Sequence, residues 1–318
     1  MQQYLDQRPN HLQWPDTAKG IGIVLVVMGH GMFPQHSLID SFHMPLFFVL
    51  AGLFVNADKY SIIEYVSKRF VRLMIPYFIF TVAVGLYAIP MGSQEVVHHI
   101  KSLWFLHTIF FASSLYYIIR RYLALKWCNI LFAAMVFILS SFSTGGVSIF
   151  ITRILFAVVF IHVGWLYKRF KLDINPNWYV LLLLFLGFMF CNALIIRQYE
   201  FLNISYFSGT LFQLPLYLLV ASTLSGSYLV MYVSQNIVYT SSLQYIGRNS
   251  LAIYAFHFPL IWKLNNLFGS LPHYDQMTYK LLYAASEYCI VFAVVMIVIW
   301  TLRKILPMKF LKYIGVSN

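Results

Sequence analysis

The chain has 318 residues, of which 60% are hydrophobic and only 10% are charged. Soluble globular domains carry about 25% charged residues, so this composition excludes a water-soluble protein, a disordered chain, a coiled coil and a nucleic-acid-binding module. In so apolar a chain, the formal net charge of +12 is typical of a protein whose basic residues set its membrane topology. The sequence therefore predicts an integral membrane protein in contact with membrane lipid.

Segments of about 17–25 mainly apolar residues can cross a bilayer as helices, and Gly, Pro and polar clusters divide the chain into ten candidate segments. In chain order the expected spans are about 18–33, 42–55, 71–89, 103–119, 127–142, 147–167, 178–196, 207–224, 251–267 and 279–302. The sequence predicts an all-α fold, a polytopic transmembrane helix bundle of about ten spans. It forms a single domain over residues 1–318, with no separate soluble domain.

Basic residues concentrate on the cytoplasmic side of membrane proteins. If the N-terminus is placed inside, 17 of the 22 Lys and Arg residues fall in inner segments. The other five are Lys101, Arg153, Arg197, Lys263 and Lys280. This asymmetry predicts that both termini are cytoplasmic, and it accounts for most of the positive charge without an anionic partner such as nucleic acid.

The first span carries ionisable side chains at helical spacing. Lys19 and His30 are eleven residues apart, which is about 16 Å along a helix and brings them to nearly the same face. Asp16 lies only modestly off that face. An ionisable group at the depth of His30 usually faces a polar cavity, where it could take a proton from a hydroxyl. The alternative is a packing histidine, with Gly29 and Gly31 permitting close helix contact.

Basic residues before the third span form a second motif. Arg69 and Arg72 are i, i+3 neighbours, which places them on one face of a helix at the cytoplasmic edge. Two guanidinium groups suit a phosphate or pyrophosphate, because each can donate two parallel hydrogen bonds. The alternative is that both arginines contact lipid headgroups.

Polar residues also occur in the second and ninth expected spans. His43 lies near the start of the second span, on the same side as His30, where it could orient a substrate or touch water at the interface. Ser250, Tyr254 and His257 form one stripe at i, i+4 and i+7, which must face protein or water rather than lipid. That stripe indicates either a site or hydrogen bonds between helices.

Two further charges, Arg153 and Glu287, lie inside expected spans, where a mutual ion pair would reduce the cost of burying them. Trp104 and Tyr254 are the aromatic residues that we would test for stacking on a sugar. The cysteines have no metal-ligand spacing, so neither a disulfide framework nor a metal site is expected. They are Cys128, Cys191 and Cys289.

Together and in this order, the motifs resemble the acyltransferase-3 family of membrane acyltransferases, especially its branch of fucose O-acetylase-like enzymes. The matching stretches are 16–21 with His30, 42–48 with Gly52, 69–73 with Pro76 and Tyr77, 103–106, and 246–250 with 257–259. By this resemblance, Lys19 and His30 match the catalytic-helix motif of the family. Arg69 and Arg72 match its arginine pair associated with acyl-CoA.

The family moves acyl groups, commonly acetyl, onto sugars of cell-surface polysaccharides or their lipid-linked precursors. The resemblance therefore implies a membrane O-acyltransferase, expected to be an O-acetyltransferase, in a bacterial cytoplasmic (inner) membrane. It implies acetyl-CoA or another acyl-CoA as donor substrate, no permanently bound cofactor, and a glycan or lipid-linked sugar as acceptor.

The expected site follows from this reaction. His30 acts as the base or carries the acyl group, and Lys19 lies on the same helix face. Asp16 either anchors Lys19 or polarises the cytosolic entrance. The acyl-CoA phosphates are expected on Arg69, Arg72 and Lys19. The residues expected to contact the acceptor are His43, Trp104, Asn249, Tyr254 and His257.

A transporter or flippase for a lipid-linked sugar is the competing interpretation, with His30, Arg153 and Glu287 lining a path. The sequence favours the enzyme because it shows no inverted repeats and no paired broken helices. Acyl-CoA-dependent labelling of glycan distinguishes the two, since a transporter does not transfer the label.

Overall fold

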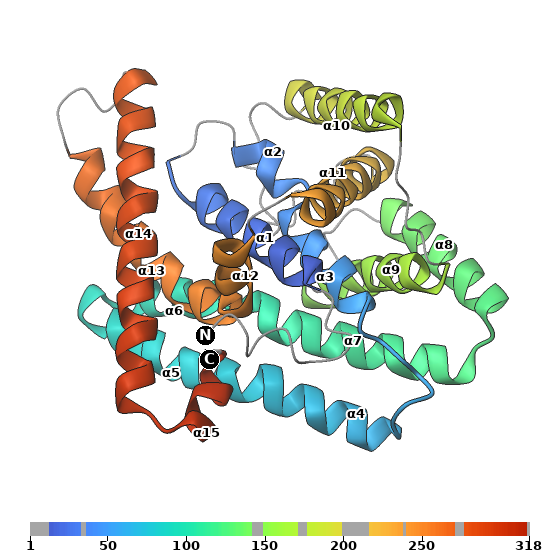
Figure 1. Ribbon diagram of the computed structural model, residues 1–318, viewed down its shortest axis with the longest axis horizontal. Coiled ribbons are helices and arrows are strands. Elements are labelled where there is room, and N and C mark those ends of the chain that lie inside the picture. The colour runs from blue at the N-terminus through green and yellow to red at the C-terminus, as the bar shows by residue number, and fades with distance from the viewer. Residues whose placement is uncertain are drawn as a thin grey trace.

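A computed structural model of the protein describes residues 13–32, 36–141, 149–170, 177–198, 216–237, 240–270 and 277–316. Within these ranges the regular structure is entirely helical and contains no strand, so the all-α prediction is confirmed for this part of the chain. Figure 1 shows the helices packed against one another in several crossing directions.

The helices follow one another with short connections over most of the chain. In order they are α1 (Trp14–His30), α2 (His36–Asp40), α3 (His43–Gly52), α4 (Ile62–Arg69), the π-helix η2 (Phe70–Met74), α5 (Ile75–Ala88), the 3-10 turn η3 (Ile89–Met91), α6 (Ser93–Lys101), α7 (Trp104–Tyr122), α8 (Leu125–Ser141), α9 (Ile149–Arg169), α10 (Trp178–Gln198), α11 (Leu216–Asn236), α12 (Ser241–Arg248), α13 (Ser250–Gly269), α14 (Met277–Ile305), α15 (Met308–Leu311) and the 3-10 turn η5 (Lys312–Ile314).

Five described segments are long and apolar enough to cross a membrane, which supports an integral membrane protein. They contain or largely coincide with the expected spans at 71–89, 103–119, 147–167, 178–196 and 279–302. The segments are Ile62–Met91, Ser93–Tyr122, Phe150–Arg169, Trp178–Ile195 and Thr278–Ile305. The expected second span is shorter, because α3 has only ten residues. Of the expected spans, residues 33, 142, 147–148 and 207–215 lie outside the described residues.

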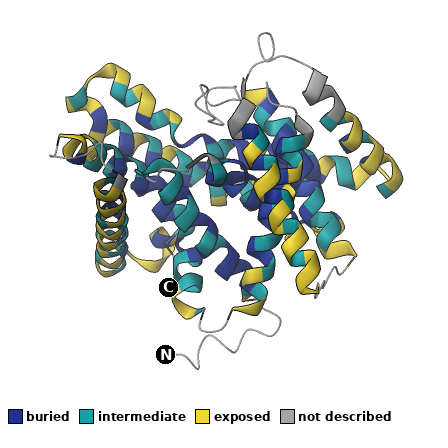
Figure 2. Cartoon of the chain, turned by 90° about the horizontal axis from the view of Figure 1, so that it is seen from above, coloured by how far each residue is buried: buried dark blue, intermediate teal, exposed yellow. Residues whose placement is uncertain are grey.

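Burial separates central helices from peripheral ones. In the segment Ser93–Tyr122, which contains α7, 67% of the 18-residue apolar stretch is buried. The corresponding share is only 17% in Trp178–Ile195 of α10 and 28% in Thr278–Ile305 of α14. Figure 2 shows the buried residues concentrated in the interior and the exposed ones along the outer helices. Exposed apolar side chains such as Leu183 and Trp300 are what a lipid environment solvates, because hydrocarbon tails surround them as favourably as protein does.

Glycines allow close backbone contact at two helix crossings. A Cβ on Gly20 would collide with the backbone of Leu243, and one on Gly247 with the backbone of Asp16, which holds α12 against α1. A Cβ on Gly52 would collide with the Ile161 carbonyl in the same way. On the facing helix α9, Gly164 lies equally close to the Val49 carbonyl of α3. Small residues at helix interfaces allow such backbone approach in membrane proteins.

We expect Gly164→Ala to destabilise the protein although alanine is the better helix former. The added methyl group meets backbone that cannot rotate away, and overpacking of this kind costs about 1–3 kcal/mol or more. The measurement is thermal unfolding of the purified protein in detergent. Gly187→Ala is the matched control, because a Cβ at Gly187 in α10 meets nothing within 4 Å. Equal transition temperatures for the two variants would contradict this packing.

Candidate active site

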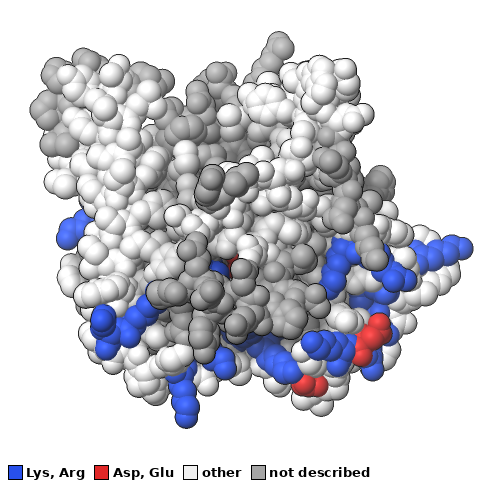
Figure 3. Space-filling view, viewed as in Figure 1, with Lys and Arg blue, Asp and Glu red and all other residues white. Residues whose placement is uncertain are grey.

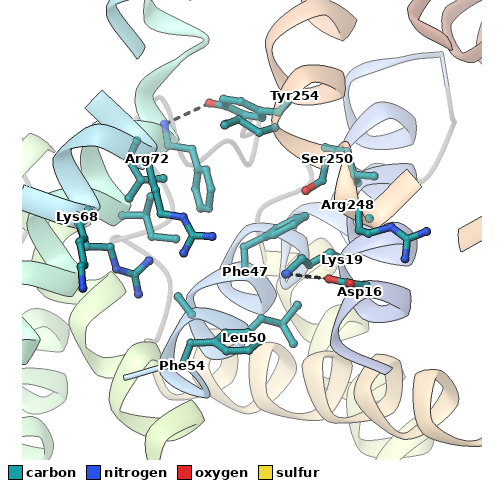
Figure 4. A pocket seen from close by; sticks show the side chains of 18 of the residues that line it. Asp16, Lys19, Phe47, Leu50, Phe54, Lys68, Arg72, Arg248, Ser250 and Tyr254 are labelled. Atoms are coloured by element: carbon teal, nitrogen blue, oxygen red, sulfur yellow. Dashed lines mark hydrogen bonds and ion pairs between the residues drawn. The ribbon is translucent and has the colours of Figure 1, made fainter. Parts of the chain in front are cut away.

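A cavity of about 920 Å³ opens between the central helices and is lined by all three predicted donor-binding residues, Lys19, Arg69 and Arg72. Its lining comes from α1, α3, α4, η2, α7, α12 and α13, and from the loop that follows α3. Figure 4 shows Lys68 and Arg72 on one wall, with Lys19, Asp16 and Arg248 on the other. Segments far apart in the sequence therefore build one pocket.

The charged lining residues form what we call the basic end of the cavity. It contains six cations and one carboxylate, namely Lys19, Lys59, Lys68, Arg69, Arg72, Arg248 and Asp16. The Lys19 Nζ lies 3.0 Å from the Asp16 Oδ1, so the expected anchoring ion pair is present. The remaining positive charge makes this end suited to a ligand with several negative groups.

Arg69 and Arg72 both line the cavity, but not on a regular α-helix. Arg69 ends α4, and Arg72 lies in the π-helix Phe70–Met74. Such π-helical turns are frequent at functional sites. The Arg69 Nε donates to the Tyr65 hydroxyl at 3.1 Å, and the Tyr65 ring is stacked on Tyr117 with centroids 3.8 Å apart. The Arg69 guanidinium is therefore held in a defined direction before any ligand binds.

One face of α1 runs along the cavity and points toward His30. The α1 residues that line the cavity are Asp16, Lys19, Ile23 and Val26, which are spaced by three or four residues as one helix face requires. His30 is the next position on that face, four residues after Val26. It does not line the cavity, which stops about one helical turn before it. Lys19 and His30 therefore lie on one face of α1, as predicted. The cavity, however, does not extend from Lys19 as far as His30.

Three histidines lie together just beyond the cavity and form the histidine cluster. The ring centroid of His30 is 5.4 Å from that of His257 and 6.5 Å from that of His43. Each of these helices also contributes cavity residues within about one turn of its histidine: α1 through Val26, α3 through Met44, and α13 through Tyr254. The cluster therefore continues the cavity in space.

Backbone carbonyls fix the tautomers of two of these rings. The His43 Nδ1 lies 2.8 Å from the Ile39 carbonyl oxygen, and the His257 Nδ1 lies 2.7 Å from the Tyr254 carbonyl oxygen. In the neutral rings Nδ1 must carry the hydrogen, which leaves the lone pair on Nε2. His43 is only 3% exposed, so it is buried in the structure rather than placed at a water interface. Within the part of the chain described, no group of three His, Cys, Asp or Glu side chains has the arrangement of a metal site.

Aromatic side chains line one part of the cavity; we call Phe47, Phe105 and Tyr254 the aromatic end. The ring of Phe105 lies 5.7 Å from that of Phe47 and 5.7 Å from that of Tyr254, measured between centroids. The Tyr254 hydroxyl donates to the Ser102 carbonyl at 2.7 Å and accepts from the Phe105 backbone N–H at 3.2 Å. These bonds tie α13 to the start of α7, so Tyr254 positions this wall.

Two other predicted acceptor residues lie away from the cavity. Trp104 is 4% exposed and lies beneath the Arg153 guanidinium, whose central carbon is 4.8 Å from the ring centroid. Asn249 is fully buried; its amide donates to the Tyr245 carbonyl at 2.8 Å, and its Oδ1 accepts from Arg303 at 3.5 Å. The structure thus brings together Tyr254, His43 and His257 from the predicted acceptor set, and places Trp104 and Asn249 outside the lining.

Glu287 contacts the end of α1, not Arg153. Its Oε2 accepts from the Met32 backbone N–H at 2.9 Å, directly after the helix that carries His30. The neighbouring Tyr288 donates its hydroxyl to the Met28 carbonyl at 3.3 Å. The two intramembrane charges therefore have different partners, and α14 braces the last turn of α1.

Sequence reasoning missed several lining residues. Lys59 and Lys68 entered it only as topology-setting charges. Phe47, Phe105 and Arg248 lay within stretches that carry the family resemblance, but no role was assigned to them. A usable signal existed for Arg248, because it lies two residues before Ser250, where the polar stripe of α13 begins. Ser250 and Tyr254 of that stripe do line the cavity.

The whole chain was compared with known proteins. A family model described as an acyltransferase domain, of the acyltransferase-3 type, matches residues 12–304. Searches of curated proteins and of solved structures found no match. The matched range includes every cavity-lining residue and all three members of the histidine cluster.

Proposed function

Because the chain belongs to the acyltransferase-3 family of membrane acyltransferases, we propose that it transfers an acetyl group from acetyl-CoA to a sugar hydroxyl. The acceptor is a cell-surface polysaccharide or its lipid-linked precursor, as in the fucose O-acetylase-like branch that its motifs resemble. One observation carries this proposal: a cavity with six cations at one end stops one helical turn short of a histidine on the same face of α1. A nucleotide thioester donor needs cations that bind its phosphates at one end and a base near its thioester at the other end.

The dimensions and chemistry of the cavity support this orientation of the donor. The nucleotide phosphates bind Lys19, Arg69 and Arg72, where charge-assisted hydrogen bonds are strongest. The pantetheine arm lies along the α1 face through Ile23 and Val26. The distance from Lys19 to His30 is about 16 Å along the helix, comparable to an extended pantetheine arm. The thioester end of the donor then points along this face toward His30.

His30 performs the acid–base chemistry of the transfer. It removes the proton from the sugar hydroxyl while that oxygen attacks the thioester carbonyl. The carbon–sulfur bond then breaks, the acetyl ester forms, and the proton passes from the imidazolium to the departing CoA thiolate. In a two-step variant His30 itself first takes the acetyl group and then gives it to the hydroxyl. His43 and His257 contact the acceptor beside His30, and Tyr254 positions the neighbouring cavity wall.

Charge distribution supports a cytoplasmic position for the basic end. Most of the Lys and Arg side chains visible in Figure 3 gather in the lower part of the view, where Figure 1 places α4 and α15. We propose ten spans with both termini in the cytoplasm of a bacterial cell, since basic residues favour that side. The donor then enters from the cytosol, and the acceptor meets His30 from within the membrane or the outer leaflet.

The test is label transfer in vesicles that contain the purified protein. Acetyl-CoA labelled in its acetyl group is supplied together with lipid-linked glycan from the producing cells, and label in the glycan fraction is counted. We expect glycan labelling that depends on the protein and is reversed by mild alkali, which cleaves an O-acetyl ester. Movement of unlabelled glycan across the vesicle membrane without label transfer would instead support a flippase.

A further inference from the structure

Arg248 differs from Lys19, Lys68 and Arg69 of the basic end in its protein contacts. It is half-buried at the end of α12 and lines the cavity, and its Nε is buried without a hydrogen-bond partner in the described part of the chain. Lys19 pairs with Asp16, Arg69 is bonded to Tyr65, and Lys68 pairs with Glu64. Within the described residues, Arg248 forms no ion pair.

The backbone around Arg248 is held in place. A Cβ on Gly247 would collide with the Asp16 carbonyl, and a Cβ on Gly20 with the Leu243 carbonyl. These contacts press α12 onto the first turns of α1, so Arg248 lies beside the Lys19–Asp16 pair. Figure 4 shows it across the cavity from Arg72. The cavity therefore has two separate cationic walls, one on α1 and α12 and the other on α4 and η2.

A half-buried guanidinium without a counterion loses hydration and gains no ion pair in return. A protein that nevertheless fixes such a group in a cavity wall has a binding site for an anion that it does not itself contain. Two facing walls suit a ligand with two anionic groups some distance apart. A single phosphate would leave one wall uncompensated.

We propose that Arg248 binds the pyrophosphate of the donor together with Lys19, while Lys68, Arg69 and Arg72 bind the separate phosphate on its ribose. This inference rests on the proposed function and deepens it, because it assigns the donor class as a nucleotide thioester phosphorylated at both places. The pyrophosphate belongs on the α1 wall because the pantetheine arm begins at it, and α1 carries the face that leads to His30. The ribose phosphate is then left for the opposite wall.

Binding measurements on the purified protein in lipid nanodiscs test this assignment without any acyl transfer. The ligands are CoA, dephospho-CoA, which lacks the ribose phosphate, and pantetheine, which lacks both groups. For Arg248→Gln we expect weaker binding of CoA and of dephospho-CoA by the same factor, about 10- to 100-fold for one charged contact. For Arg72→Gln we expect weaker binding of CoA and unchanged binding of dephospho-CoA.

Arg169→Gln is the matched control, because Arg169 is an exposed arginine at the end of α9 outside the cavity. Arg248→Lys keeps the charge but loses the planar fork, so an intermediate loss is expected. The inference is overturned if Arg248→Gln binds CoA like the wild type, or if it loses affinity for CoA but not for dephospho-CoA. Failure of the wild-type protein to bind CoA at all would instead overturn the proposed function.

Discussion

We expect His30→Ala to lower acetyl transfer by at least about 100-fold and to leave CoA binding intact. Removal of a general base typically costs about 10²- to 10⁴-fold in rate, and loss of an acyl carrier would remove turnover completely. Donor affinity is preserved because the cavity that would hold the nucleotide ends one turn before His30. The measurements are label transfer in vesicles and CoA binding in nanodiscs, made on the same preparation.

His98→Ala is the control for this prediction, since His98 is exposed on α6 and has no part in the proposed chemistry. We expect it to transfer acetyl groups at the wild-type rate. A second variant, His30→Gln, retains a hydrogen-bonding side chain of similar size but cannot act as a base near neutral pH. Wild-type activity in His30→Gln would show that the imidazole only packs between helices.

Local spacing was enough to predict the parts of the site that lie on one helix. The eleven-residue separation of Lys19 and His30 placed them on one face of α1, and the cavity lining follows that face as far as Val26. The stripe on α13 was visible for the same reason, since Ser250 and Tyr254 line the cavity. A helical period needs no knowledge of neighbouring helices, so these relations can be read from residue numbers alone.

Arg248 shows why the rest of the site could not be predicted. In the sequence it is one of many basic residues that satisfy the positive-inside rule, and its place two residues before the polar stripe of α13 does not show which helix it will face. What decides this is the crossing of α12 with α1 through Gly20 and Gly247, a contact between distant parts of the chain. Long-range packing of this kind has no signal in hydropathy or spacing.

The layering of the bundle was hidden for a related reason. Buried and lipid-facing helices are both apolar, because lipid tails are as apolar as the protein interior. Hydropathy therefore identified the segments that became α7 and α10 without showing that α7 is central and α10 peripheral. The π-helical turn at Arg72 was equally invisible, since its residues are compatible with an ordinary helix.

Removing both arginines of the pair, by Arg69→Gln with Arg72→Gln, has the second large effect that we expect. Each charged contact to a phosphate contributes about 10- to 100-fold in affinity, so the double variant binds CoA at least about 100-fold more weakly. Its binding also depends less on salt, because screening acts on the charges that were removed. The measurement is CoA affinity in nanodiscs at low and high ionic strength.

The control for the arginine pair is the double variant Lys168→Gln with Arg169→Gln, which removes two neighbouring exposed charges at the end of α9. It changes the net charge equally and leaves the cavity lining untouched. If both double variants bound CoA like the wild type, Arg69 and Arg72 would serve only lipid headgroups. The cavity location of both arginines, and the Tyr65 hydroxyl that orients Arg69, favour the donor instead, because a group that only contacts headgroups needs neither.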